Sequence, residues 1–273
     1  ITKEFKKKDI IEIFAPVDLK EFNNKLKFKK YDYLNDKIVI TSISGVIPIK
    51  GALEFVYLAK EILKEFPNVC FIFAGQIISS QKRYAKIFLN EIKKLPKNKF
   101  FYKGLSNNVA EILYNSDLFV CTSKSEAGPI TLLEAIAMDL PIITSNVGIV
   151  PQLIEHKKSG VILKKNNLEN LVKETKKLLL NRSLFSKLSQ HQNSVKKKFS
   201  HISVASQYLN FYKRINFESN NAQVKDFFKS KSIQLIRNFI ALLCVGFVFY
   251  FILNEEKFLT LLFNSSINIL KSY

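Results

Sequence analysis

The sequence has little cysteine, methionine or glycine, and far fewer acidic than basic residues. Its three cysteines, Cys70, Cys121 and Cys244, lie far apart without the spacing of metal ligands, and two of them fall in apolar runs that are typical of strands. We expect them to be small buried hydrophobic residues in a reducing compartment. The one methionine is Met138, so we expect that Ile1 is not an initiator residue and that no signal peptide precedes the fold. We therefore expect a fragment or a processed product.

The shortage of acidic residues is marked, because 42 Lys and Arg against 23 Asp and Glu leave a net charge of +19. This excess favours an anionic partner such as phosphate, nucleic acid or an acidic membrane surface, although lysine codons are A/T-rich and genome composition could supply many of the lysines. Residues 157–198 hold twelve Lys/Arg and two acids, and form either an anionic-membrane surface or a solvated helical face. No recognition-helix or aromatic stacking pattern is present, so we expect no nucleic-acid partner.

Short apolar runs alternate with longer amphipathic ones from Lys37 onward. Buried parallel strands are expected at 38–44, 69–74, 100–104, 118–123, 141–146 and 160–164. Helices are expected between them at 52–66, 84–95, 106–116, 129–138 and 150–155, and after them at 167–181, 183–199 and 202–215. The alternation predicts an α/β fold, a doubly wound, Rossmann-like parallel sheet with trailing helices. Such a sheet binds ligands at the carboxyl ends of its strands.

A polar linker, 217–231, precedes an apolar tail, 232–273. Residues 239–253 contain no charged or amide side chain, and extending the run back to Ile233 gives enough length for a membrane helix if Arg237 reaches the interface. Basic residues precede the run and acidic residues follow it, which predicts that the globular part lies on the cytoplasmic face of the membrane. The alternative is a buried or interfacial helix.

Scarce glycines gather at the ends of the predicted strands, at Gly45, Gly75, Gly104, Gly128 and Gly148. One interpretation is that the backbone approaches a ligand at this edge of the sheet. The alternative is that these are ordinary turn glycines.

The stretch SKSEAGPITLLEA, residues 123–135, carries two glutamates at an apolar helix start. Glu134 is costly to desolvate there unless a ligand or a lysine pairs with it. Pro129 suits the first position of a helix, so the amides of Ile130 and Thr131 should point into the strand-end crevice and favour a diphosphate. Glu126, in the preceding loop, can accept hydrogen bonds from ligand hydroxyls in the same crevice, or it is an exposed loop acid.

Within SEAGPITLLEAIAMDLPIITSNVG, the spacing of Glu126 and Glu134 resembles the E-x7-E signature of family-4 GT-B glycosyltransferases. Other segments are similar in the same order: VDLKEF (17–22) to the segment after the interdomain linker, IPIKG (47–51) to the phosphate-binding lysine turn, FPNVCFIFAG (66–75) to the second strand, VPQLIEHKKSGVIL (150–163) to the region after the motif, and FSHISVASQYLNFYKRI (199–215) to the terminal helix. The resemblance assigns 1–36 to the end of the interdomain linker region and 37–216 to the nucleotide-sugar-binding domain.

The resemblance implies the donor-binding half of a retaining glycosyltransferase that needs no metal and no other cofactor. It implies that Glu126 contacts the donor sugar, that Glu134 contacts the ribose, and that Lys50, if it is not simply a surface lysine, neutralises the departing diphosphate. The implied donor-binding residues are Gly45, Lys50, Gly104, Leu105, Glu126, Ala127, Gly128, Pro129, Ile130, Thr131 and Glu134, with Lys50 and Glu126 catalytic and Gly104 and Leu105 against the base. The scattered His156, His191 and His201 offer no metal site.

Some features depart from the family pattern. The family usually has an arginine five positions before the lysine, where this sequence has Gly45, and its loss should weaken the diphosphate contact by about 1.5 to 3 kcal/mol unless another lysine substitutes. Gln152 replaces a common glutamate and Asp139 a usual glycine. The acceptor-binding amino-terminal domain is missing, so we expect little turnover unless the same chain or a separate one supplies it.

Two functional hypotheses remain. The first is a membrane-associated glycosyltransferase that transfers a sugar from a nucleotide-sugar, most commonly UDP-linked, to a polysaccharide or glycolipid acceptor. The second is a non-catalytic module of the same fold, tethered to the membrane, that binds a nucleotide or a partner protein. The glutamate pair and Lys50 favour the first hypothesis, and Gly45 and the missing half of the enzyme favour the second.

Overall fold

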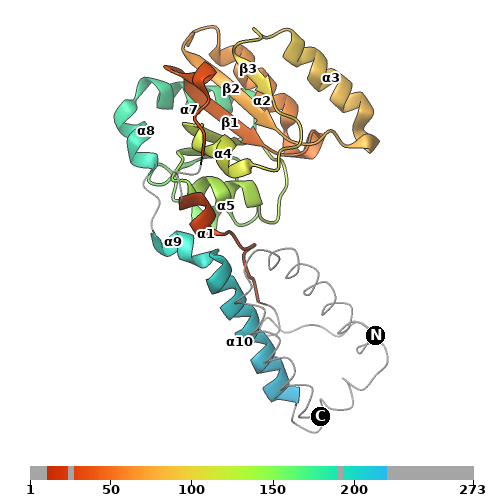
Figure 1. Ribbon diagram of the computed structural model, residues 1–273, viewed down its shortest axis with the longest axis vertical. Coiled ribbons are helices and arrows are strands. Elements are labelled where there is room, and N and C mark those ends of the chain that lie inside the picture. The colour runs from red at the N-terminus through yellow and green to blue at the C-terminus, as the bar shows by residue number, and fades with distance from the viewer. Residues whose placement is uncertain (1–10, 24–27, 190–192, 220–273) are drawn as a thin grey trace. The chain divides into compact units, whose positions relative to one another are not determined.

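The computed structural model describes residues 11–23, 28–189 and 193–219 (Figure 1). The chain divides into two compact units, Ile1–Gln207 and Tyr208–Tyr273. The first unit contains the sheet and its covering helices, and the described part of the second is the end of helix α10 (His201–Ser219). The domain boundaries expected at 36, 216 and 231 stay predictions.

Six strands form one parallel sheet. They are β1 (Ile38–Ile43), β2 (Val69–Ala74), β3 (Phe100–Tyr102), β4 (Leu118–Cys121), β5 (Ile142–Thr144) and β6 (Val161–Ile162). Their order is β3-β2-β1-β4-β5-β6, and every neighbouring pair is parallel. The first strand, β1, thus lies at the centre of the sheet. The chain adds β2 and β3 outward on one side of it, and then returns to add β4, β5 and β6 outward on the other side. This confirms the predicted doubly wound sheet, in which β2 has the expected bounds and the other five strands are shorter than expected.

Helices cover both faces of the sheet (Figure 1). They are α1 (Leu19–Asn23), α2 (Ala52–Ile62), α3 (Lys82–Lys93), α4 (Val109–Tyr114), α5 (Ile130–Ala137), α6 (Val150–Leu153), α7 (Leu168–Leu180), α8 (Arg182–Leu188) and α9 (Asn193–Lys198), with short 3-10 helices η3 (Asp32–Leu34), η4 (Pro48–Lys50) and η5 (Ser79–Gln81). Residues of α2, α3, α7 and α8 share the core of one face, and residues of α1, α4, α5 and α6 share the core of the other.

The apolar runs form strands because both faces of the sheet are buried. Successive side chains of a strand point to opposite faces, so Phe71 and Phe73 enter one core while Ile72, between them, enters the other. Phe73 packs against Phe88 of α3, with their ring centroids 5.0 Å apart. Continuous hydrophobicity is therefore what this sheet requires of its strands.

Two expectations about helix ends are wrong in detail. The helix expected over 183–199 is two helices, since α8 ends at Leu188 and α9 begins at Asn193. The hydroxyl of Ser189 donates to the carbonyl of Ser186, a local bond that favours ending the helix. Pro129 is the N-cap of α5 in extended conformation, and the first helical residue is Ile130.

Asp139, found where the family usually has glycine, has a φ of 59° at the carboxyl end of α5. Aspartate tolerates this left-handed conformation better than most residues. Its carboxylate lies 2.7 Å from the ammonium of Lys196 on α9, a lysine side chain that is only 10% exposed. The same ammonium lies 3.5 Å from the carbonyl oxygen of Ala137. The substitution thus keeps the turn and adds a connection between α5 and α9.

Cys70 and Cys121 are buried free thiols in β2 and β4, as expected. Cys244, the apolar tail 232–273 and the membrane helix expected within it at 233–253 lie outside the described residues. In the part of the chain that the structure describes, none of the helices has the length and hydrophobicity needed to cross a bilayer. The basic stretch 157–198 is spread over α7, α8, α9 and neighbouring loops, and four of its lysines form ion pairs with Glu155, Glu65, Glu174 and Asp139.

Candidate functional site

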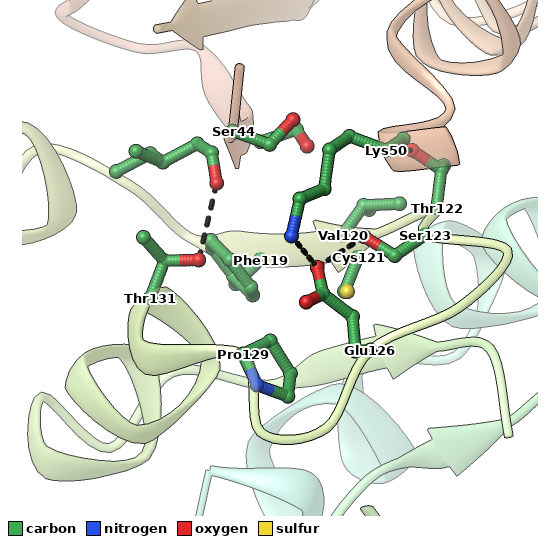
Figure 2. A pocket seen from close by; sticks show the side chains of 12 residues that line it. Ser44, Lys50, Phe119, Val120, Cys121, Thr122, Ser123, Glu126, Pro129 and Thr131 are labelled. Carbon is green, nitrogen blue, oxygen red and sulfur yellow. Dashed lines mark hydrogen bonds and ion pairs between the residues drawn. The ribbon is translucent and has the colours of Figure 1, made fainter. Parts of the chain in front are cut away.

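A small hollow lies at the carboxyl ends of β1 and β4, the two central strands where the winding of the sheet reverses (Figure 2). In open α/β sheets, this reversal leaves a crevice because the loops after the two strands diverge to opposite faces. The hollow is lined by Ser42, Ile43, Ser44, Lys50, Phe119, Val120, Cys121, Thr122, Ser123, Glu126, Pro129 and Thr131. The predicted Lys50, Glu126, Pro129 and Thr131 are therefore brought together from two separate segments, the turn after β1 and the loop and helix start after β4.

The turn that carries Lys50 is held tightly against the end of β4. Gly51 has a φ of 70°, and a Cβ atom there would lie 2.3 Å from the carbonyl oxygen of Thr122. The hydroxyl of Thr122 donates to the carbonyls of Lys50 at 3.1 Å and Gly51 at 2.8 Å, and the amide of Lys124 donates to Ile49 at 2.7 Å. Only glycine permits this approach, which directs the Lys50 side chain into the hollow.

Lys50 and Glu126 form an ion pair inside the hollow. The ammonium nitrogen of Lys50 lies 2.5 Å from Oε1 of Glu126, and the side chains are 30% and 11% exposed. The hydroxyl of Ser123 donates to the same Oε1 at 2.9 Å (Figure 2). The alternative of an exposed loop acid at Glu126 is therefore wrong. Sequence reasoning placed both residues in the site but did not anticipate that they pair with each other.

The loop before α5 is fixed from two directions. The hydroxyl of Thr131 donates to the carbonyl of Ile43 at 3.1 Å, which joins the first turn of α5 to the end of β1. The amide of Ile149 donates to Ala127 at 3.0 Å, and a Cβ atom on Gly148, whose φ is 48°, would lie 2.0 Å from that same carbonyl oxygen. The amides of Ile130 and Thr131, in the first turn, have no intrahelical acceptor. Pro129 and Thr131 line the hollow, so this first turn lies at its rim.

Glu134 lies one turn further along α5 and is not among the residues that line the hollow. Its Oε2 is buried, with no hydrogen-bond partner among the described residues. Burial, and secondarily the charge of Glu21 on α1, raises the pKa of this carboxyl to about 7. No ion pair joins Glu134 to a lysine within the described ranges, so the paired-carboxylate alternative is not supported.

The remaining predicted residues lie at the same edge of the sheet but outside the hollow. Gly104, with a φ of 65°, follows β3 and has open space where a Cβ would be, and Leu105 beside it is 68% exposed. Gly45 follows β1, and the nearest atom to a Cβ there is a carbonyl oxygen of Gln76 at 4.0 Å. Gly75 differs, because its Cβ would lie 1.7 Å from the carbonyl oxygen of Ser44. Close backbone packing, rather than ligand approach, accounts for Gly75.

Hydroxyl residues of the site were missed by sequence reasoning. Ser44 lines the hollow, and its hydroxyl oxygen is buried with no partner in the described part of the chain. Ser123 and Thr122 hold Glu126 and the Lys50 turn. The signal was present, because these residues are the polar ends of otherwise apolar strand segments. Two of the three histidines have contacts elsewhere: Nδ1 of His156 accepts a hydrogen bond from the Ile162 amide, and Nδ1 of His201 lies 3.6 Å from Oδ1 of Asp18, a residue distant in sequence.

Replacing Glu134 with glutamine should stabilise the protein at pH 8 but not at pH 5. A carboxyl whose pKa rises from 4.5 to about 7 on folding is favourable to the folded state while protonated, and that contribution is lost as the pH rises through 7. The variant should gain up to about 3 kcal/mol of unfolding free energy at pH 8. Urea unfolding at both pH values measures this, with Glu65→Gln, an exposed site, as control. An equal effect of Glu134→Gln at both pH values would contradict it.

Comparison with known proteins agrees with the fold and the motif. The family model described as glycosyl transferases group 1 matches residues 23–198, well over half of the chain. An uncharacterized glycosyltransferase of Haemophilus influenzae is 29% identical over 195 residues, covering 68% of this chain and 50% of the relative. A UDP-Gal:α-D-GlcNAc-diphosphoundecaprenol α-1,3-galactosyltransferase of Escherichia coli is 28% identical over 166 residues, covering 59% and 41%. The chain spans about half the length of the relatives it matches or less.

Among solved structures, Anabaena HepE in complex with UDP and glucose is similar with a TM-score of 0.64 and 16% identity, over 74% of this chain and 56% of that one. At such low identity the likeness shows the fold alone, which is the Rossmann-like sheet expected for a GT-B domain. The family-model match over residues 23–198 shows the family as well as the fold. The chain belongs to the glycosyl transferases group 1 family.

Proposed function

We propose that the chain is the nucleotide-sugar-binding half of a retaining glycosyltransferase. The observation that carries this proposal is the meeting of Lys50, Glu126 and the first turn of α5 at the point where the sheet reverses. A cation and free helix amides suit a diphosphate, and a carboxylate beside them suits sugar hydroxyls. The substrate is a nucleotide-sugar, UDP-linked in our proposal, and no metal or other cofactor takes part.

Each residue then has a definite role. Lys50 neutralises the negative charge that develops on the diphosphate as its bond to the sugar breaks. Glu126 accepts hydrogen bonds from the donor sugar, and Glu134, whose buried Oε2 has no partner within the described residues, accepts them from the ribose. Ala127, Gly128 and the amides that follow contact the sugar and phosphates. Gly104 and the exposed Leu105 lie against the base.

The acceptor is proposed to be a polysaccharide or glycolipid, bound by an amino-terminal domain in the same or a separate chain. The Escherichia coli relative acts, by its name, on α-D-GlcNAc-diphosphoundecaprenol, a lipid-linked acceptor. Because this chain matches about half of its relatives' length, turnover requires that second domain. Binding of the donor does not.

Calorimetric titration of the full chain with UDP, UDP-glucose, UDP-N-acetylglucosamine and GDP-mannose tests the donor site. At pH 8, where Glu134 is largely ionised, we expect saturable binding of one nucleotide class, and binding about a hundredfold weaker in Glu134→Ala, because the ribose loses a charged hydrogen-bond partner. Glu65→Ala, on the surface, is the matched control. If the folded chain binds none of these ligands at millimolar concentration, weaker than about −4 kcal/mol, the proposal fails.

Substitution of Gly45 distinguishes a functional donor site from a non-catalytic relative. A side chain fits at this position, since a Cβ atom there would lie 4.0 Å from its nearest neighbour and φ is outside the left-handed region. Gly45→Arg should therefore bind the nucleotide about tenfold or more tightly by adding a charge-assisted bond to the diphosphate. Gly45→Ala should bind like the natural chain. Unchanged affinity in both variants would favour the non-catalytic module.

We also propose that the protein works at the cytoplasmic face of an anionic membrane, as the net charge of +19 favours. Exposed lysines 157, 187 and 197 belong to the basic stretch, and exposed lysines 82, 86 and 97 lie on or near α3. Flotation with phosphatidylglycerol vesicles should show at least about tenfold weaker binding when the first three become glutamine. Substitution of the second three lysines by glutamine is the matched control and should weaken vesicle binding less. Equally weakened binding in the two triple variants, or equal binding of the natural chain to neutral vesicles, would contradict a specific basic surface.

A further inference from the structure

We propose that the Lys50–Glu126 ion pair makes the site discriminate between a nucleotide-sugar and the sugar-free nucleoside diphosphate. This inference rests on the proposed donor function of the hollow. It assigns to Glu126 a second role beyond sugar contact, as the internal competitor of the diphosphate for Lys50.

The pair occupies the place where an anion would bind. Nζ of Lys50 lies 2.5 Å from Oε1 of Glu126, and both side chains line the hollow. Lys50 is the one cation among the described residues that line it. The nearby Lys124 lies 2.6 Å from Glu54 and is thus already paired outside the hollow. A diphosphate that binds Lys50 therefore competes with Glu126 for the same ammonium, and full use of this cation separates the pair.

Separation leaves Glu126 in an unfavourable position. Its side chain is 11% exposed, so water replaces the lost ammonium poorly, and Ser123 supplies a single hydroxyl to Oε1. With a bare diphosphate on Lys50, two anionic groups also face each other at short range. A buried charge that loses its partner is strongly destabilising. The sugar-free nucleotide therefore binds against an opposing internal interaction.

A sugar nucleotide changes this balance because it brings hydroxyl donors with it. These replace Lys50 as partners of Glu126 while the diphosphate replaces Glu126 as the partner of Lys50. Both charges of the separated pair are then satisfied. Once the sugar has been transferred, the donors leave with it, and re-formation of the ion pair favours release of the nucleoside diphosphate. The discrimination thus acts between substrate and spent product.

The test compares dissociation constants of UDP and UDP-glucose, or of GDP and GDP-mannose if the guanine nucleotide binds, for the full chain. Glu126→Gln keeps the shape of the side chain and an acceptor for Ser123 but removes the charge. We expect the sugar-free nucleotide to bind about tenfold more tightly, while the nucleotide-sugar binds no more tightly than before. Glu54→Gln is the matched control, because it removes one carboxylate charge from the Lys124 ion pair at the same edge of the sheet.

A second variant should change the affinity for the sugar-free nucleotide in the opposite direction. Ser123→Ala removes the hydroxyl that holds Oε1 of Glu126, so the carboxylate depends more on Lys50 and the sugar-free nucleotide should bind more weakly. An unchanged ratio of the two dissociation constants in Glu126→Gln and Ser123→Ala overturns the inference and leaves the donor function intact. An equal change in Glu54→Gln also overturns it. Failure of the natural chain to bind any nucleotide overturns both.

Discussion

The packing of the turn after β1 against the end of β4 is the contact on which the candidate site depends. Gly51 approaches Thr122 so closely that no other residue fits, and the Thr122 hydroxyl bonds both carbonyls of the turn. The contact exists because β1 and β4 are neighbours although they are distant in sequence. Topology brings the two loops together, and one glycine sets their distance.

Two carboxylates in this region illustrate two ways of keeping a charge in a crevice. Glu126 has a cation and a hydroxyl within hydrogen-bond distance on one oxygen. Glu134 has a buried oxygen without a partner among the described residues, and its pKa rises to about 7. The first is satisfied before any ligand arrives, whereas the second is not. In the proposed complex, one end of the nucleotide-sugar would contact a carboxylate that is already paired, and the other end would contact a carboxylate that has an unpaired oxygen.

Much of this arrangement was predictable from sequence and some was not. The strands were predictable because burial on both faces requires continuous apolar runs such as VCFIFA. Lys50 and Glu126 were found by their motif, but their ion pair depends on side-chain geometry across 76 residues, which no local pattern encodes. The break between α8 and α9 was missed because Leu188 and Val195 on its two sides are seven residues apart, a helical spacing, although all the residues between them are polar. The glycines were ambiguous, since Gly75 and Gly148 serve backbone packing while Gly45 has open space.

The aspartate at the end of α5 has a consequence for how the domain assembles. Asp139 and Lys196 are separated in the chain by β5, α6, β6, α7 and α8. Their contact therefore forms only when those elements have wound across the sheet and brought α9 back to α5. The pair closes a long loop, and loop closure of this kind couples the order of distant segments. Helix α5, which carries Glu134, is in this way connected to a helix that follows the last strand, and the order of the candidate site depends on the completion of the whole sheet.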